Sequence, residues 1–176
     1  QNDSLCEQLY HRERSFPMHN LRALTCRAVL QVLYRGIRVL SHADSRVRQE
    51  LLSLPEGRTV RFAVSPKPDA PSLTFTVLDG TIQKAPRAAE ADIEIVFKNE
   101  KMAFRVFTGR MGISGAYAAH AFTLRGNINE TMSIVRIIDL VEAYLFPGFM
   151  TRRILRELPK KQCPAMLVYL RLIPAL

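Results

Sequence analysis

The sequence has no tryptophan, only three cysteines and no apolar stretch long enough to cross a bilayer. Arginines interrupt each apolar run before it reaches the ~20 residues that a membrane-spanning helix needs. Cys6, Cys26 and Cys163 are odd in number, lie far apart and form no CxxC unit. This spacing argues against a disulfide framework and against a zinc site. We therefore expect a reduced compartment such as the cytoplasm, with neither a cofactor nor a metal.

Acidic residues are also scarce. The chain has 16 Asp and Glu but 25 Lys and Arg, which gives a formal charge of +9. Such an excess favours nucleic acid, an anionic membrane surface or an acidic protein as partner. Nucleic-acid binding by stacking requires exposed aromatic side chains beside the basic ones. The aromatic residues here lie mostly in apolar runs. We therefore expect no nucleic acid, and a peripheral contact with anionic membrane instead.

The 176 residues suit one domain with terminal extensions. We expect a flexible arm over 1–19, a domain over 20–146 and a basic, apolar extension over 147–176. The extension carries Arg152, Arg153 and Arg156, and its apolar end is a candidate contact for a protein partner or a second copy of the chain.

A helix is predicted from about Asn20, a favourable N-cap, to about Leu40. Its helical spacing joins Leu21, Leu24, Ala28, Val29, Val32, Leu33 and Val39 into an apolar stripe. Arg27, Arg35 and Arg38 share the opposite face. That basic face is open to two interpretations: a solvated side of a core helix, or a surface that rests on anionic lipid. A second short helix is expected from His42 to Leu54.

The middle of the chain alternates between apolar and polar residues, which predicts strands over 59–64, 73–78, 81–84 and 91–97. Asp79-Gly80 is a strong hairpin turn. In the last of these strands, Ile93, Ile95 and Phe97 face one way. This pattern is typical of a sheet that is covered on one face.

Helical spacing returns after this strand, with short helices expected over 101–109 and 112–121. Residues 122–126 form a final strand and turn. Asn129 is the expected N-cap of a long apolar helix that ends before Pro147-Gly148.

Catalytic signatures are weak. His120 precedes an apolar strand and has no metal-ligand spacing to the other histidines. Asp92 and Glu94 are a candidate acid–base pair, but a solvated sheet face accounts for them as well. We expect no enzyme activity and no catalytic residue.

The order of these pieces resembles the sterol carrier protein 2 family of lipid-binding domains. The resemblance spans roughly residues 45–145. It rests on the Ala91–Phe97 strand, the Phe107/Gly109-Arg110 helix end, Ala116–Ala119 and Leu124-x-Gly126-Asn127.

The resemblance implies an α+β fold in which helices cover one face of a mainly five-stranded sheet. It also implies an apolar tunnel, between sheet and helices, for a sterol, fatty acyl or isoprenoid lipid. Some bacterial members are linked to isoprenoid quinone synthesis. The expected wall of the tunnel consists of Phe104, Phe107, Met111, Ile113, Tyr117, Phe122, Leu124, Met132, Val135, Ile138, Val141 and Leu145.

The same apolar set also describes an ordinary solid core. In that alternative, the chain is a protein-interaction module that acts through its basic helix or its C-terminal segment. Retention of a lipid by the purified chain would separate the two hypotheses.

Overall fold

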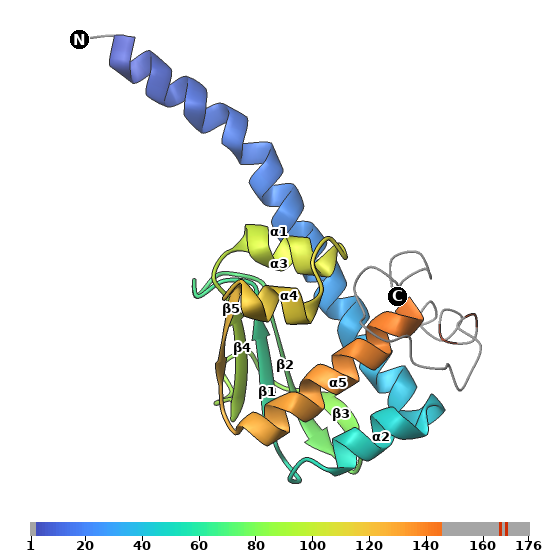
Figure 1. Ribbon diagram of the computed structural model, residues 1–176. Helices are drawn as coiled ribbons and strands as arrows, with labels where there is room; N and C mark the ends of the chain where they lie inside the picture. Colours follow the sequence, from blue (N-terminus) through green and yellow to red (C-terminus); the bar gives the residue numbers. More distant parts are fainter. Residues whose placement is uncertain (1–2, 146–165, 167, 169–176) are drawn as a thin grey trace.

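The computed structural model describes the backbone of residues 3–145, 166 and 168, and their side chains except those of 3–20 and Ser114. Two helices precede a run of four strands, and two short helices, a fifth strand and a last helix follow within this part of the chain (Figure 1). Their order is α1 (Asp3–Ala43), α2 (Ser45–Leu52), β1 (Thr59–Ala63), β2 (Ser72–Leu78), β3 (Thr81–Lys84), β4 (Ile93–Phe97), α3 (Glu100–Phe107), α4 (Ile113–Ala118), β5 (Phe122–Arg125) and α5 (Ile128–Leu145).

The five strands form one mixed sheet in the order β3-β2-β1-β4-β5. β1 runs parallel to β4, and the other neighbours are antiparallel. Alternation along each strand sends Phe62 and Ile95 to a buried inner face. Arg61 and Glu94, which are register partners, lie on the opposite, outer face. The predicted α+β class and the five-stranded sheet are therefore confirmed.

The predicted hairpin at Asp79-Gly80 is confirmed as well. Both residues have positive φ, at 49° and 66°, which matches the twist that a two-residue turn between antiparallel strands requires. The turn joins β2 to β3.

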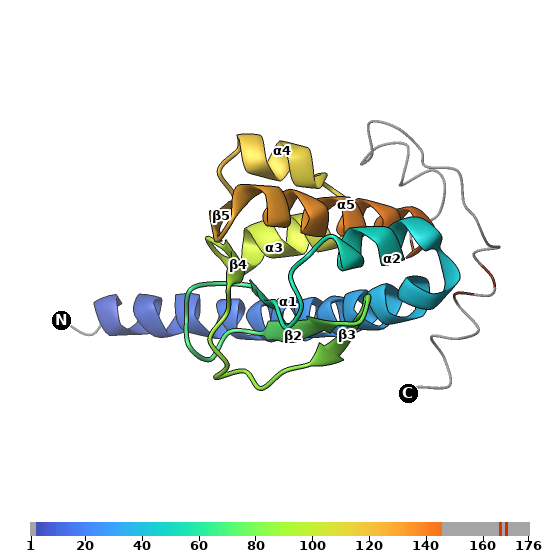
Figure 2. The ribbon, with the colours of Figure 1, turned by 90° about the horizontal axis from the view of Figure 1, so that it is seen from below.

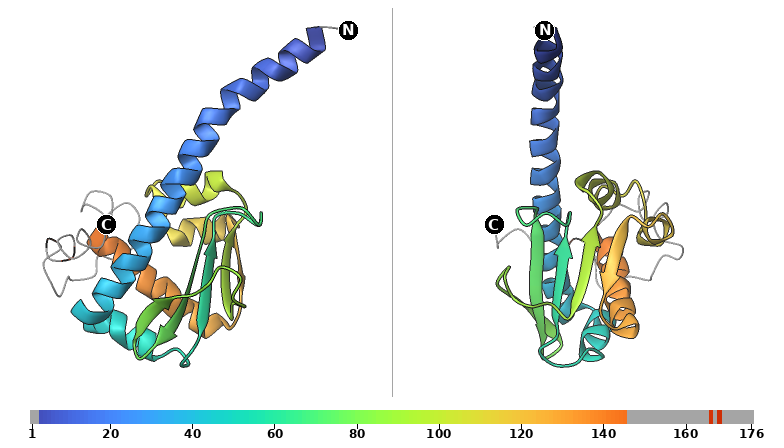
Figure 3. Two further views of the ribbon diagram at one scale, coloured as in Figure 1. Left: turned by 180° about the vertical axis from the view of Figure 1, so that it is seen from behind. Right: turned by 90° about the vertical axis from the view of Figure 1, so that its left-hand side faces the viewer.

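Helices α1 and α5 cover the inner face of the sheet, and Figure 3 shows α5 on one side of the strands. The buried side of α1 consists of Cys26, Leu30, Leu33, Ile37 and Leu40. Their spacing of three and four residues makes a single stripe along the helix. The core therefore lies between this stripe, the inner face of the sheet and α5.

The predicted apolar stripe of α1 was wrong for most of its members. Leu21, Leu24 and Val32 are exposed, because the helix is rotated relative to the prediction. Gly36 explains this rotation: a Cβ there would lie 2.9 Å from Val141 Cγ1 on α5. The absent side chain lets the two helices approach closely along this side.

The predicted start of α1 near Asn20 was also wrong, because the helix begins at Asp3 and passes through Pro17. A proline removes one helical hydrogen bond and bends a helix, but it does not have to end it. The first half of α1 projects beyond the rest of the fold (Figures 1 and 2). The division into arm, domain and extension stays a prediction, and Arg152, Arg153 and Arg156 lie outside the described residues.

The expected cap of α5 also needs correction. Asn127, not Asn129, caps the helix: its Oδ1 accepts a hydrogen bond from the Asn129 backbone N–H at 2.9 Å. The Asn127 carbonyl accepts the first helical bond, from the Thr131 N–H. The glycine-asparagine turn after β5 therefore leads directly into α5.

Candidate functional site

An aromatic cluster lies where α3, α4, β4 and β5 meet. Phe97 packs edge-on against Phe107 and Phe122, with ring centroids 5.4 and 5.5 Å apart. Tyr117 lies 6.1 Å from Phe122. Phe97 is 2% exposed and Tyr117 is 59% exposed. These four side chains, which we call the aromatic cluster, form a continuous apolar connection from the surface to the core.

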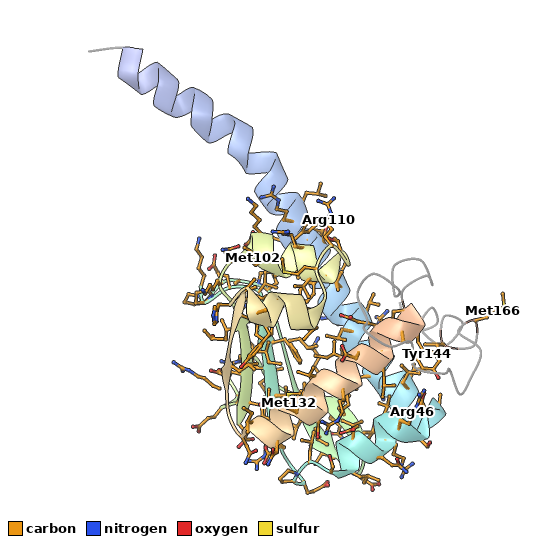
Figure 4. All side chains as sticks on the ribbon, viewed as in Figure 1. Arg46, Met102, Arg110, Met132, Tyr144 and Met166 are labelled. Atoms are coloured by element: carbon orange, nitrogen blue, oxygen red, sulfur yellow. The ribbon has the colours of Figure 1, made fainter. Side chains whose placement is uncertain are left out.

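The remaining predicted wall residues lie at different depths. Ile138 and Val141 are buried on α5. Val135 is half-buried, and Met132 is 47% exposed. The largest group is partly buried and packs against the core, and it comprises Phe104, Met111, Ile113, Leu124 and Leu145. Figure 4 places Met132 on α5 and Arg110 close to α3. That these side chains line one cavity stays a prediction.

Two carboxylates on α5 were missed by the sequence reasoning. Asp139 and Glu142 are half-buried and stand three residues apart, on one side of the helix. Burial raises the pKa of both, and the Asp139 carboxylate raises that of Glu142 further, to about 8. Their helical spacing was readable from the sequence, but their burial depends on how α5 packs.

The raised pKa of Glu142 predicts a pH-dependent stability. The folded state holds a proton here that the unfolded state, with an ordinary pKa of 4.5, releases. This contribution to stability is complete below pH 4.5 and is lost as the pH rises through about 8. Glu142→Gln is expected to flatten the fall in urea midpoint between pH 5 and 9. An unchanged pH profile in this variant would contradict the assignment.

The candidate catalytic carboxylates are held in ion pairs. Asp92 accepts hydrogen bonds from the Thr59 backbone N–H at 2.8 Å and from Arg58 at 3.0 Å. These bonds, the first of them above all, hold the pKa of Asp92 below its ordinary value. Glu94 pairs with Arg61 at 3.1 Å. Each of the two carboxylates therefore has its own arginine partner.

His120 is exposed and occupies a turn between α4 and β5, with φ of 48°. Its backbone N–H donates to the Tyr117 carbonyl. Among the described side chains, no three His, Cys, Asp or Glu residues come close enough together to hold a metal ion.

The predicted basic face of the first helix is partly exposed. Arg27 and Arg38 reach solvent on α1, whereas Arg35 is half-buried. No helix in the described part of the chain combines the length and the apolar character needed to cross a membrane.

A groove of about 660 Å³ lies on the outer face of the sheet, away from the aromatic cluster. We call it the outer groove. Residues of β1, β4 and β5 form its floor, and the loops over 64–71 and 85–92 form its walls. Sequence reasoning missed it because the walls come from segments that are distant in the chain.

A scan of protein-family models and a search of curated proteins both find no match for the chain. Solved structures with a similar arrangement do exist. One is the ubiquinone synthesis protein UbiJ-SCP2, which is 17% identical, with a TM-score of 0.44, over 62% of this chain and 95% of that one. A second is the apo form of sterol carrier protein 2 from Yarrowia lipolytica, which is 14% identical, with a TM-score of 0.42, over 63% of this chain and 87% of that one.

A third is a conserved hypothetical protein from Thermus thermophilus, described as a candidate sterol carrier protein. It is 22% identical, with a TM-score of 0.40, over 65% of this chain and 86% of that one. All three structures thus carry sterol carrier protein descriptions, the family that the order of sequence elements resembles.

Proposed function

We propose that the chain binds a hydrophobic lipid of the sterol, fatty acyl or isoprenoid type between its sheet and its helices. It then transfers or presents this lipid, as an accessory factor in lipid or quinone biosynthesis, without catalysing a reaction. The observation that carries the proposal is the aromatic cluster, in which exposed Tyr117 connects through Phe122 to buried Phe97. The order of elements that resembles sterol carrier protein 2 domains supports the same conclusion.

Helix α4 is the part of the wall best suited to move. It is six residues long, its start has no side-chain cap, and it packs mainly on α3. Short helices without caps contribute little stability of their own. Displacing α4 would admit an apolar chain, and each methylene removed from water would contribute about 0.8 kcal/mol.

Brominated fatty acid is expected to quench the fluorescence of a Phe107→Trp variant. Because the chain has no tryptophan, this residue would be a unique reporter inside the aromatic cluster. Bromine quenches indole only at short range, so a lipid in the proposed site would remove most of the emission at saturation.

Thr123→Trp is the matched control, since Thr123 is an exposed residue that lines the outer groove instead. Its emission is expected to change little at the same lipid concentration. Equal quenching of both variants, or none in Phe107→Trp, would contradict a lipid site at the aromatic cluster.

Membrane contact through the basic face of α1 is the second part of the proposal. Each exposed arginine near an anionic surface is expected to contribute about 1 kcal/mol, or roughly fivefold in partitioning. The double variant Arg27→Gln/Arg38→Gln should therefore sediment with anionic liposomes roughly 25-fold less well at low salt. Binding that is insensitive to both salt and these substitutions would show that the contact is not electrostatic.

Exposed apolar residues on α1 favour a second candidate function. Leu21 is 61% exposed and Leu24 is 63% exposed. Both would suit a protein-interaction module with a solid core, in which α1 meets a partner. Absence of lipid uptake, together with capture of a partner that Leu21→Ser/Leu24→Ser abolishes, would favour this function over lipid binding.

A further inference from the structure

The outer groove concentrates positive charge on a face of the sheet that the helices leave uncovered. Four cationic side chains line it, and Glu94 is the one carboxylate among its lining residues. The cations are Arg61, Lys67, Arg87 and Arg125. A concave site with one dominant sign of charge attracts ligands of the opposite sign.

Two of these arginines hold the walls of the outer groove in place. Arg61 donates hydrogen bonds to the carbonyls of Arg87 and Ala89. Arg87 in turn donates through one terminal nitrogen, Nη2, to the carbonyls of Pro68 and Ala70. These bonds fasten both loops to each other and to β1. The groove is therefore formed before any ligand arrives, which lowers the cost of binding.

The other cationic groups remain available. Lys67 is exposed, and its ammonium group has no ion-pair partner among the described residues. Arg125 is 82% exposed and reaches Glu94 only loosely, at 3.8 Å. The second terminal nitrogen of Arg87, Nη1, has no hydrogen-bond partner in the described part of the chain. Guanidinium groups of this kind match the paired oxygens of carboxylates and phosphates.

The rest of the lining does not suit a lipid chain. It consists of the hydroxyl side chains of Ser65, Ser72 and Thr123, together with alanines, prolines and one valine. No leucine, isoleucine, methionine or aromatic side chain lines this groove in the described part of the chain. The volume falls within the range of small-molecule sites.

We propose that the outer groove binds a small, water-soluble molecule that carries carboxylate or phosphate groups. Lys67 and Arg125 would contact the anionic groups directly, while Arg61 and Arg87 keep the walls in position. This site is separate from the proposed lipid site, because it occupies the other face of the sheet.

The test is a titration of the full chain with inorganic pyrophosphate at constant ionic strength, in which NMR measures the chemical shift of each backbone amide. We expect saturable shifts at Ser65, Lys67 and Thr123. The charge-reversing variant Lys67→Glu/Arg125→Glu is expected to bind at least tenfold more weakly. Glu94→Gln, which removes the competing carboxylate, should bind several-fold more tightly.

Lys101→Glu is the matched control, because Lys101 is an exposed cation on α3, outside the groove. It should bind pyrophosphate within twofold of the wild-type chain, and far-UV circular dichroism should confirm that every variant is folded. Shifts that are spread over all basic surfaces, or unchanged affinity in Lys67→Glu/Arg125→Glu, would overturn the proposal. Lipid quenching in the Phe107→Trp background should be the same with and without the groove substitutions, so the two proposals succeed or fail separately.

Discussion

Replacing Asp44 with alanine is expected to lower the free energy of unfolding by about 3 kcal/mol. Asp44 is fully buried between α1 and α2. Its Oδ2 accepts hydrogen bonds from Tyr144 at 2.8 Å and from Arg46 at 2.6 Å. Its Oδ1 caps α2 by accepting the Arg46 backbone N–H. Figure 4 shows Tyr144 on α5 and Arg46 on α2, so this one carboxylate connects both helices to the end of α1.

This loss of unfolding free energy lies at the low end of the range for breaking a buried ion pair. The reason is that the Arg46 side chain is 30% exposed, so water replaces part of its interaction with Asp44. Asp44→Asn keeps the oxygen acceptor but loses the charge, so we expect about half the loss. Urea unfolding at pH 7 measures both variants. Wild-type stability in Asp44→Ala would contradict the connecting role of this carboxylate.

Acid should reduce the difference between Asp44→Ala and the wild-type chain. Burial alone would raise the pKa of Asp44, but the hydrogen bonds from Arg46 and Tyr144 outweigh it and hold the pKa below its ordinary value. The stabilisation is therefore present at neutral pH and is lost as the pH falls through the pKa of the folded state. Urea unfolding of both chains at a series of pH values down to pH 2 measures whether their free energies of unfolding become more similar.

Gly126→Ala is expected to destabilise the fold by about 3 kcal/mol or more, through backbone strain and a steric clash. Gly126 has φ of 119°, which a residue with a side chain rarely adopts. A Cβ there would lie 2.5 Å from the Asp92 carbonyl oxygen and 3.2 Å from Ile93 Cα. Both are backbone atoms at the start of β4, so relief would require the end of β5 to move away from its neighbour.

Gly57→Ala separates the two causes. Gly57 also has positive φ, at 78°, but a Cβ there would meet nothing within 4 Å. Gly57→Ala should therefore lose only the free energy that positive φ costs a residue with a side chain, about 1 kcal/mol. Thermal and urea unfolding of the two variants give the comparison. Equal losses would show that the contact with Asp92 has no energetic effect.

Much of the sheet was predictable because its signals are local. The two-residue alternation over 93–97 placed Ile93, Ile95 and Phe97 on one face, and Asp79-Gly80 has a backbone preference that is independent of its surroundings. The order of helices and strands followed from the same local patterns. The α+β class was what the family resemblance, which rests on that order, implied.

The rotation of α1 was not predictable in the same way. Its apolar residues occupy more than one side of the helix, so spacing alone did not decide between Leu24 and Leu30 as core residues. The close approach at Gly36 decides it, and that contact involves α5, about one hundred residues later in the chain. Hydrophobic periodicity describes one helix at a time and contains no information about such a neighbour.

The outer groove was unpredictable for a related reason. Arg61 stands in a strand and Arg87 in a loop, and each looks like an ordinary solvated cation in the sequence. Only the folded sheet brings their guanidinium groups against the carbonyls of two loops. By contrast, Phe107, Tyr117 and Phe122 were among the predicted wall residues, because they lie in adjacent apolar segments. Phe97 was predicted only for the buried face of its strand.

Native mass spectrometry of the purified chain, followed by organic extraction, tests lipid binding most directly. If the chain binds lipid, we expect a protein peak that carries one lipid of defined mass, or acquires one from a mixed lipid extract. Extraction would then identify the apolar chain that the aromatic cluster accommodates. A clean mass of the chain alone, with no uptake from any lipid offered, would contradict the lipid-binding function and favour a solid core that acts through protein contacts.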